Sequence, residues 1–300
     1  MMKRIFLFGL VNILVILAVS IILSLTGLNG HFGGANYLGL FLFCLVWGMS
    51  GAFISLLISK WMAKFSMGVQ IITLEGPHRE LVATVHRLAR RAGLSTMPEV
   101  GIYQADELNA FATGPSRNNS LVAVSTGLLK NMSDDEIEGV LAHEIAHIAN
   151  GDMVTMTLIQ GVMNAFVMFF ARIVAFMIDQ YMRNNDRDSR GLGPLAHSLV
   201  VIVLQIVFGI FAQIIVAWFS RWREFRADHG GADLASKDKM IKALTALERF
   251  YPQLESSENN SKATQFQAMQ ISSRSSFMQL FSTHPPLVER ISALKNSQLR

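Results

Sequence analysis

Four long apolar segments constrain the fold of this chain more than any other feature of its sequence. Residues 5–25, 37–59 and 199–219 carry no charged side chain, and residues 153–178 carry only Arg172. Because a helix rises about 1.5 Å per residue, about 20 such residues cross the hydrocarbon core of a bilayer. We therefore expect a multi-pass membrane protein anchored by four mostly α-helical transmembrane segments, with the lipid bilayer as its surroundings.

The composition supports this expectation and excludes several classes of protein. Apolar residues make up 51% of the chain and charged residues only 16%. The single cysteine, Cys44, excludes a disulfide framework and a cysteine-ligated metal site. No nucleic-acid partner is expected, since the net charge of +4 is modest and no nucleic-acid motif accompanies it. The first apolar segment lacks a small-residue cleavage site, which favours a retained anchor.

Lysine and arginine residues indicate how these segments cross the membrane. They flank the first pair, within residues 1–64, and are absent from the loop inside it, which predicts a hairpin with both ends in the cytoplasm. Three arginines directly follow the second pair, residues 153–220, so we interpret it as a second transmembrane hairpin. The alternative is a buried or half-inserted hairpin. Arg172 is expected to reach the membrane surface from near the end of its segment, and the alternative is a buried functional charge.

The two remaining segments, residues 65–152 and 221–300, have the composition of a soluble α+β domain. Helical periodicity and short β-branched runs predict one helix and three strands, over residues 78–92, 100–103, 109–112 and 121–124. Gly114 and Pro115, together with Asn118 and Asn119, predict a turn before the last of these strands. In the second segment, helices are expected over residues 223–233 and 239–250, with a short final helix that contains Arg290.

A further helix carries the motif His143-Glu144-Ile145-Ala146-His147, and Ser133 with Glu136 forms a capping box at its start. Residues four apart lie on one face of a helix, so His143 and His147 can bind the same ion. Glu144 can then take a proton from a water that the ion polarises, which is the chemistry of metal-dependent hydrolysis. The alternative is an ordinary helix with two solvated histidines.

This motif lacks a third protein ligand, and Glu224 is the strongest candidate for it. Glu224 and Asp228 lie four residues apart in a predicted helix, so both carboxylates face the same way. One can bind the metal while the other accepts a hydrogen bond from a ligating histidine. Two imidazoles and one carboxylate favour zinc. The alternative is a charged helix face that pairs with its own arginines.

Four strings of residues resemble one known family. They are Asn-Ala-Phe-Ala-Thr-Gly at 109–114, the ten residues 143–152, Arg-Glu-Phe-Arg-Ala-Asp at 223–228, and Thr-His-Pro-Pro at 283–286. Together they resemble the HtpX family of bacterial, stress-associated membrane metalloproteases, which is related to the CAAX prenyl endopeptidases. The resemblance covers essentially the whole chain and implies a zincin-like (gluzincin) α+β fold with a small sheet.

The resemblance also implies roles for individual residues. His143, His147 and Glu224 would bind one Zn²⁺, Glu144 would be the catalytic base, and Asp228 would support the ligands from behind. Further contacts with substrate or with the developing oxyanion are implied for Asn109, Ala110, Phe111, His284 and Arg290. The first three would form an edge strand to which an extended peptide adds. A plain structural strand and a structural turn histidine remain the alternatives for the strand and for His284.

The expected function is that of a zinc metalloendopeptidase in the bacterial inner membrane, with its active site facing the cytoplasm. His147 lies only a few residues before the third apolar segment, which favours membrane proteins as polypeptide substrates. The resemblance implies quality control of misfolded or damaged membrane proteins, overlapping with the FtsH protease. Two rival hypotheses are a membrane scaffold with a structural zinc ion and a zinc hydrolase acting on lipid or prenylated substrates.

Overall fold

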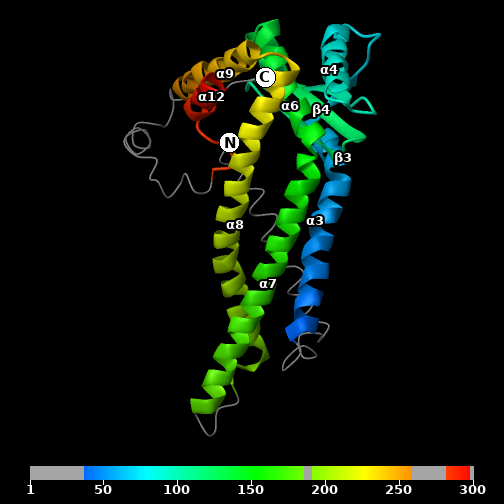
Figure 1. The fold of residues 1–300 in the computed structure, drawn as a ribbon. Coiled ribbons are helices and arrows are strands. Elements are labelled where there is room, and N and C mark those ends of the chain that lie inside the picture. The colour runs from blue at the N-terminus through cyan, green and yellow to red at the C-terminus, as the bar shows by residue number, and fades with distance from the viewer. Residues whose placement is uncertain (1–36, 186–190, 259–281, 298–300) are drawn as a thin grey trace. The chain divides into compact units, whose positions relative to one another are not determined.

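The computed structural model describes residues 37–185, 191–258 and 282–297 (Figure 1). The chain divides into two compact units. The apolar unit comprises the described residues up to Ser55 together with Met156–Ala217, and the site unit comprises Leu56–Thr155 and Trp218–Arg300. The first expected transmembrane segment, residues 5–25, lies outside the described residues.

Three long helices supply the apolar unit: α3 (Tyr37–Met67), α7 (Asp152–Asn185) and α8 (Gly193–Leu234). Each is long and apolar enough to cross a membrane, in agreement with three of the four expected segments. Inside the apolar unit their contact is made by small and medium side chains from all three helices: Leu40, Cys44, Val167, Met168 and Ala212. Other apolar side chains of this unit, including Leu38, Val46 and Phe211, are instead more than half exposed, as expected for helices surrounded by lipid.

Arg172 does not reach outward as expected. Its side chain is buried, and its Nη1 donates a hydrogen bond to the Met168 carbonyl at 2.9 Å. Arg172 lies in the interior of α7 rather than near its end, because α7 continues to Asn185 through the polar residues that follow the apolar segment. The carbonyl one turn earlier in the same helix is therefore the partner that its guanidinium finds.

The site unit contains a four-stranded mixed sheet. Its strands are β1 (Gln70–Ile72), β2 (Glu99–Tyr103), β3 (Ala110–Ser116) and β4 (Asn119–Ser125), in the order β1-β2-β4-β3. The β2–β4 pair is parallel, and both outer pairs are antiparallel. Strand β3 is therefore an edge strand. β4 is buried at every position from Ser120 to Ser125, as its run of apolar residues requires.

Strand β3 restricts the turn expected around Gly114, Pro115, Asn118 and Asn119 to its second half, because the strand includes Gly114 and Pro115. It continues through both residues to Ser116, with an irregular register between Thr113 and Ser116, and the chain turns at Arg117 and Asn118. Gly114 has a φ of 143° and lies against the backbone of the neighbouring strand, so it permits the irregularity. Proline is tolerated at such a bulge in an edge strand because no ladder donor is needed there.

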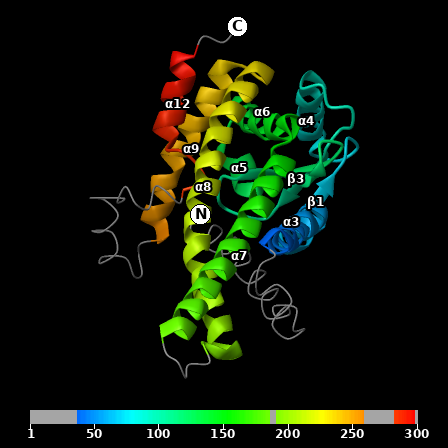
Figure 2. The ribbon, with the colours of Figure 1, turned by 60° about the horizontal axis from the view of Figure 1, so that its bottom comes forward.

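Helices cover the sheet and form the rest of the site unit (Figure 2). They are α4 (Arg79–Arg91), α5 (Thr126–Asn131), α6 (Asp134–Asn150), α9 (Lys237–Glu258) and α12 (Leu287–Asn296), together with the ends of the three long helices. The main core joins α4, α6 and α9 to strands β2 and β4. Strand β1 and helix α5 were not predicted from the sequence, and α8 is one continuous helix where a span and a separate helix were expected.

Candidate metal centre

Helix α6 carries the two histidines and is held by its N-terminal capping box and by the main core. At its start, the Ser133 backbone N–H donates to the Glu136 carboxylate at 2.7 Å, as the capping box predicts. Leu141, Ile145 and Ile148 are fully buried in the main core. The opposite side of the helix is left for His143 and His147, which are also buried, with exposed fractions of 9% and 8%.

Helix α8 brings Glu224 to these histidines, and glycines let the two helices approach closely. A Cβ atom at Gly231 would lie only 3.1 Å from the backbone nitrogen of His143, and one at Gly230 would lie 3.0 Å from the Cβ of Ala146. Any side chain at Gly231 would push the helices apart. The close approach therefore places the carboxylate of α8 against the imidazoles of α6.

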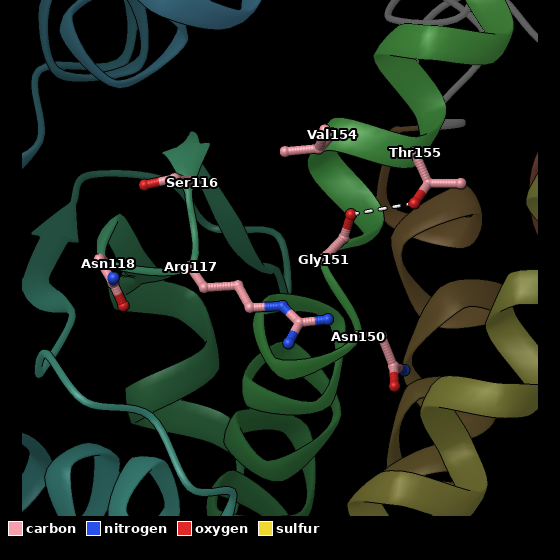
Figure 3. A pocket seen from close by; sticks show the side chains of 7 residues that line it. All are labelled: Ser116, Arg117, Asn118, Asn150, Gly151, Val154 and Thr155. Atoms are coloured by element: carbon pink, nitrogen blue, oxygen red, sulfur yellow. Dashed lines mark hydrogen bonds between the residues drawn. The ribbon is translucent and has the colours of Figure 1, made fainter.

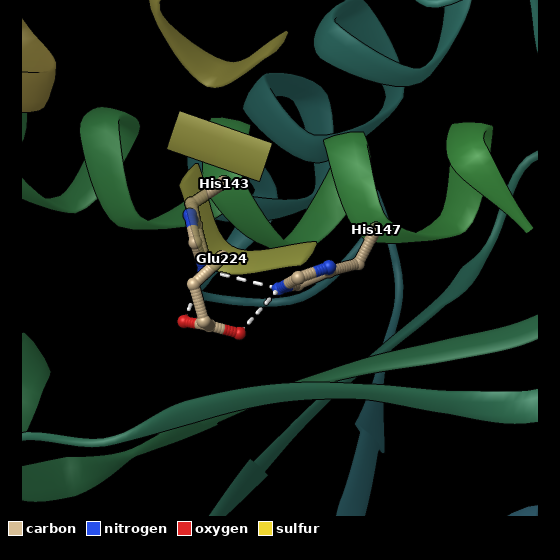
Figure 4. Close-up of side chains that lie close together, drawn as sticks. All are labelled: His143, His147 and Glu224. Atoms are coloured by element: carbon tan, nitrogen blue, oxygen red, sulfur yellow. Dashed lines mark hydrogen bonds and ion pairs between the residues drawn. The ribbon is translucent and has the colours of Figure 1, made fainter. Parts of the chain in front are cut away.

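Three possible ligand atoms converge in this arrangement (Figure 4). Nε2 of His147 lies 3.1 Å from Nε2 of His143 and 3.3 Å from Oε1 of Glu224, and Nε2 of His143 lies 3.5 Å from Oε2 of Glu224. Zinc–nitrogen and zinc–oxygen bonds of about 2.0–2.2 Å give ligand atoms about 3.3–3.5 Å apart in a tetrahedral site. The spacing of the three side chains therefore fits one tetrahedral ion.

Burial of Glu224 supports the same assignment. Its side chain is fully buried on a helix, where an ionised carboxylate without a cation is costly. Oε2 lies within ion-pair distance of His284 and Arg290, at 2.8 and 3.3 Å, but accepts no well-aligned hydrogen bond. This excludes the alternative of a solvated helix face and leaves a buried acceptor facing two imidazoles.

Asp228 and Arg290 lie behind His143. Oδ1 of Asp228 is 2.9 Å from Nδ1 of His143, and Arg290 holds Asp228 through two hydrogen bonds, of 2.7 and 2.5 Å. Burial opposes charge on His143, but the carboxylates of Asp228 and Glu224 outweigh it and raise the pKa of His143 to about 9. Since a metal ligand must be deprotonated, metal binding releases this proton.

Asp152 is a residue of the site that the sequence analysis missed. Its Oδ2 lies 2.7 Å from Nδ1 of His147, and its Oδ1 accepts a hydrogen bond from Arg226. The sequence pattern that could have indicated this contact is Gly151, a residue type that commonly ends a helix, directly before the acid Asp152. Taken alone, a glycine at this position indicates only where the helix ends.

The remaining predicted site residues divide into two groups. Glu144 is partly buried on α6 beside its ligand neighbour, and His284 reaches Glu224 from the segment before α12. Ala110 and Phe111 instead begin the edge strand β3, which packs against α6, and Asn109 directly precedes that strand. The rings of Phe111 and Tyr103 lie 5.6 Å apart, and both side chains belong to a small cluster on the sheet.

A recess of about 420 Å³ lies beside the junction of α6 and α7 (Figure 3). Arg117 from the β3–β4 turn reaches towards Gly151 at this junction, and Asn150 and Thr155 also line the recess. None of His143, His147 or Glu224 lines it. The recess therefore borders the end of the motif helix and is separate from the three converging ligand atoms.

A buried His-His-Glu cluster on two helices below an edge strand defines a metallopeptidase, and the comparisons agree. The family model described as peptidase family M48 matches residues 75–298. Two relatives named Protease HtpX, from Shewanella denitrificans and Shewanella oneidensis, are each 53% identical to this chain. Their alignments cover 99% and 98% of this chain and 100% of each relative.

A solved structure shows the same fold at lower sequence identity. The crystal structure of S. mikatae Ste24p matches with a TM-score of 0.57 and 20% identity, over 93% of this chain and 66% of that chain. The chain belongs to peptidase family M48. It is a membrane metallopeptidase that acts on polypeptides, as the family and its apolar helices together show.

Proposed function

We propose that the chain is a zinc-dependent endopeptidase whose active site is built by His143, His147 and Glu224. The observation that carries the proposal is the convergence of the two imidazole Nε2 atoms, 3.1 Å apart, on the Glu224 carboxylate, whose two oxygens lie 3.3 and 3.5 Å from them. Two imidazole nitrogens and one carboxylate oxygen are a donor set typical of catalytic zinc, which keeps a further position for water or substrate. A zinc ion held there supplies a Lewis acid that polarises the scissile carbonyl and makes water more acidic.

Glu144 is the general base in this proposal. It directly follows His143 in α6, and its charge interacts with that of Arg290 behind His143. It takes a proton from the attacking water and passes it to the leaving amine, which lets both halves of the reaction use one group. Its partial exposure supports this role, because the group has to be reachable by water.

In this proposal Asp228 and Arg290 hold the ligand His143 in place, and His284 contacts the reacting substrate. Asp228 accepts a hydrogen bond from Nδ1–H of His143 and so leaves Nε2 of that ring for the metal. Arg290 is engaged by Asp228 and is only 6% exposed, which supports an anchoring role over contact with the oxyanion. The His284 side chain is 42% exposed, which supports a role as a donor to the tetrahedral oxyanion.

The edge strand β3 is the proposed binding site for an extended substrate. It begins with Ala110 and Phe111, directly after Asn109, and its outer edge has no neighbouring strand among the described residues. A peptide that adds there makes backbone hydrogen bonds, which give affinity with little dependence on sequence. Such binding suits an enzyme with many misfolded substrates.

We further propose that the substrates are misfolded or damaged membrane proteins and that the enzyme resides in the bacterial inner membrane with its site facing the cytoplasm. The supporting features are in the sequence: both hairpins have lysine and arginine on their outer flanks, and the third apolar segment begins soon after His147. Overlap with the FtsH protease in quality control belongs to the same proposal and follows from the family resemblance.

The test compares purified wild-type protein with the variants Glu144→Gln and Glu224→Ala for zinc content and for cleavage of one membrane protein and its soluble domain. We expect the wild type to bind one zinc ion per chain and to prefer the membrane-embedded substrate. Glu144→Gln should keep the zinc and lose cleavage, whereas Glu224→Ala should lose both. Full cleavage by Glu144→Gln would contradict the assigned base, and a scaffold with structural zinc would retain its cellular role in that variant.

A further inference from the structure

Asp152 contacts the metal ligand His147 on the side of the imidazole that faces away from the other ligands. Nδ1 of His147 lies 2.7 Å from Oδ2 of Asp152, while Nε2 of the same ring faces His143 and Glu224. A ring that binds metal through Nε2 carries its proton on Nδ1, and a carboxylate there fixes both the tautomer and the ring orientation. We propose that Asp152 is a positioning residue for His147 and that Arg226 holds Asp152 in place. This inference rests on the zinc site proposed above.

The local backbone is built to make this contact. In a continuous helix a residue five positions after His147 would lie about 140° around the axis, away from the histidine face. Gly151 ends α6 in the left-handed conformation, with φ 70° and ψ 30°, and α7 begins at the next residue. The turn therefore returns Asp152 to the side of α6 that carries His147. A residue other than glycine would adopt this conformation only at a cost of roughly 1 kcal/mol.

The charge of Asp152 is balanced on all sides. The side chain is about 1% exposed, so a carboxylate there needs partners. Arg226 donates to Oδ1, which leaves Oδ2 for His147. The first turn of α7 adds the positive end of a helix dipole at the same place. The guanidinium of Arg226 also lies 5.1 Å from the ring of Trp222, which limits its movement.

The second imidazole of the site has the same kind of support. His143 faces Asp228 through Nδ1, and Arg290 holds Asp228, as His147 faces Asp152 and Arg226 holds Asp152. Each metal-binding ring is thus backed by an aspartate that an arginine anchors. Arg226 comes from α8, the helix that carries Glu224. The pair of Asp152 and Arg226 therefore links the end of α6 to α8, the helix of the third ligand.

The inference is tested by measuring zinc affinity on the full-length protein, with zinc alone titrated against a chelator. Asp152→Asn keeps the shape of the side chain but removes the charge and can present an amide N–H to Nδ1, which disfavours the required tautomer. We expect zinc to bind 10- to 100-fold more weakly to this variant. The melting temperature of the metal-free protein should change little. Asp238→Asn, at an exposed ion pair with Lys242, is the matched control and should bind zinc like the wild type.

Arg226 provides an independent variant. Arg226→Gln should also weaken zinc binding, whereas Arg226→Lys should keep most of the affinity. The double variant Arg226→Gln with Asp152→Asn should bind zinc no more weakly than Asp152→Asn alone. The absorption spectrum of Co²⁺ bound to Asp152→Asn should also differ from that of the wild type, since a merely structural role would leave the ligand geometry unchanged.

The outcomes separate this inference from the proposed function. Wild-type zinc affinity in His143→Ala would refute the proposed site itself. Loss of zinc in His143→Ala, together with wild-type affinity in Asp152→Asn, would refute only the role of Asp152. If metal-free Asp152→Asn has lost its fold while Arg226→Gln binds zinc like the wild type, then Asp152 serves the fold and the inference is also wrong.

Discussion

Replacing Gly231 by alanine tests whether the distance between α6 and α8 sets the metal affinity. The added Cβ would lie 3.1 Å from the backbone nitrogen and 3.2 Å from the Cα of His143, and 2.9 Å from Sδ of Met240. The methionine side chain can move away, but the helix backbone cannot move without carrying His143 with it. Ordinary contacts begin at 3.4 Å, so the helices must separate by a few tenths of an ångström.

The size of the effect follows from two opposed contributions. Alanine gains about 1 kcal/mol over glycine inside a helix, whereas overpacking typically costs about 1–3 kcal/mol. The metal-free protein should therefore lose about 1 kcal/mol of stability. Metal–ligand distances tolerate only about 0.2 Å, so moving His143 from Glu224 by more than that should weaken zinc binding about tenfold, or about 1.4 kcal/mol.

The assay is a chelator-competition titration combined with thermal unfolding of the metal-free protein. Gly209→Ala is the control, because Gly209 belongs to the same helix and a Cβ there meets nothing within 4 Å. Gly209→Ala should bind zinc like the wild type. If Gly231→Ala also binds zinc with wild-type affinity, the spacing of the helices does not set the ligand geometry and the reasoning fails.

Three further predictions concern the support of the site. Arg87 and Lys239 bind the Glu138 carboxylate and hold its pKa below its usual value. Glu138→Gln should therefore cost about 1 kcal/mol of stability at neutral pH. In urea-unfolding measurements this loss should vanish as the pH falls through the lowered pKa of Glu138. Leu141→Ala should destabilise the metal-free protein by about 2–5 kcal/mol in denaturant titrations, because the side chain is fully buried in the main core on the helix that carries the two histidines. Ser125→Ala should cost about 1–2 kcal/mol and speed hydrogen exchange at Asn109, since the buried Ser125 hydroxyl accepts from the Asn109 N–H at 3.1 Å. Unchanged stability or exchange in any of these variants would contradict the corresponding contact.

The motif helix and the position of Glu224 beside it were predictable because the orientation of each residue pair depends on local periodicity. His143 and His147 share a face of one helix, and Glu224 and Asp228 share a face of another, so residue spacing alone orients each pair. The convergence of the two pairs was inferred from their chemistry. The close approach that achieves it depends on Gly230 and Gly231, whose packing role has no signature in a single sequence.

Features that depend on backbone conformation at one residue were not predicted. The contact between Asp152 and His147 requires the left-handed turn at Gly151, whereas helical spacing separates the two residues. Strand β3 passes through Gly114 and Pro115 because the outer edge of the sheet tolerates a bulge and a missing donor. Strand β1 has only three residues, too few for a periodic pattern to reveal.

The distribution of the ligands along the chain also sets when the enzyme becomes active during synthesis. His143 and His147 leave the ribosome before α7 and most of α8 have been made, and Glu224 follows only near the end of α8. A nascent chain that has completed only the first of these helices holds two ligands, one short of the set that catalytic zinc sites use. Proteolytic activity must therefore wait until the second apolar hairpin is complete. In the proposed site, the order of the ligands in the sequence therefore delays proteolysis until translation has passed Glu224.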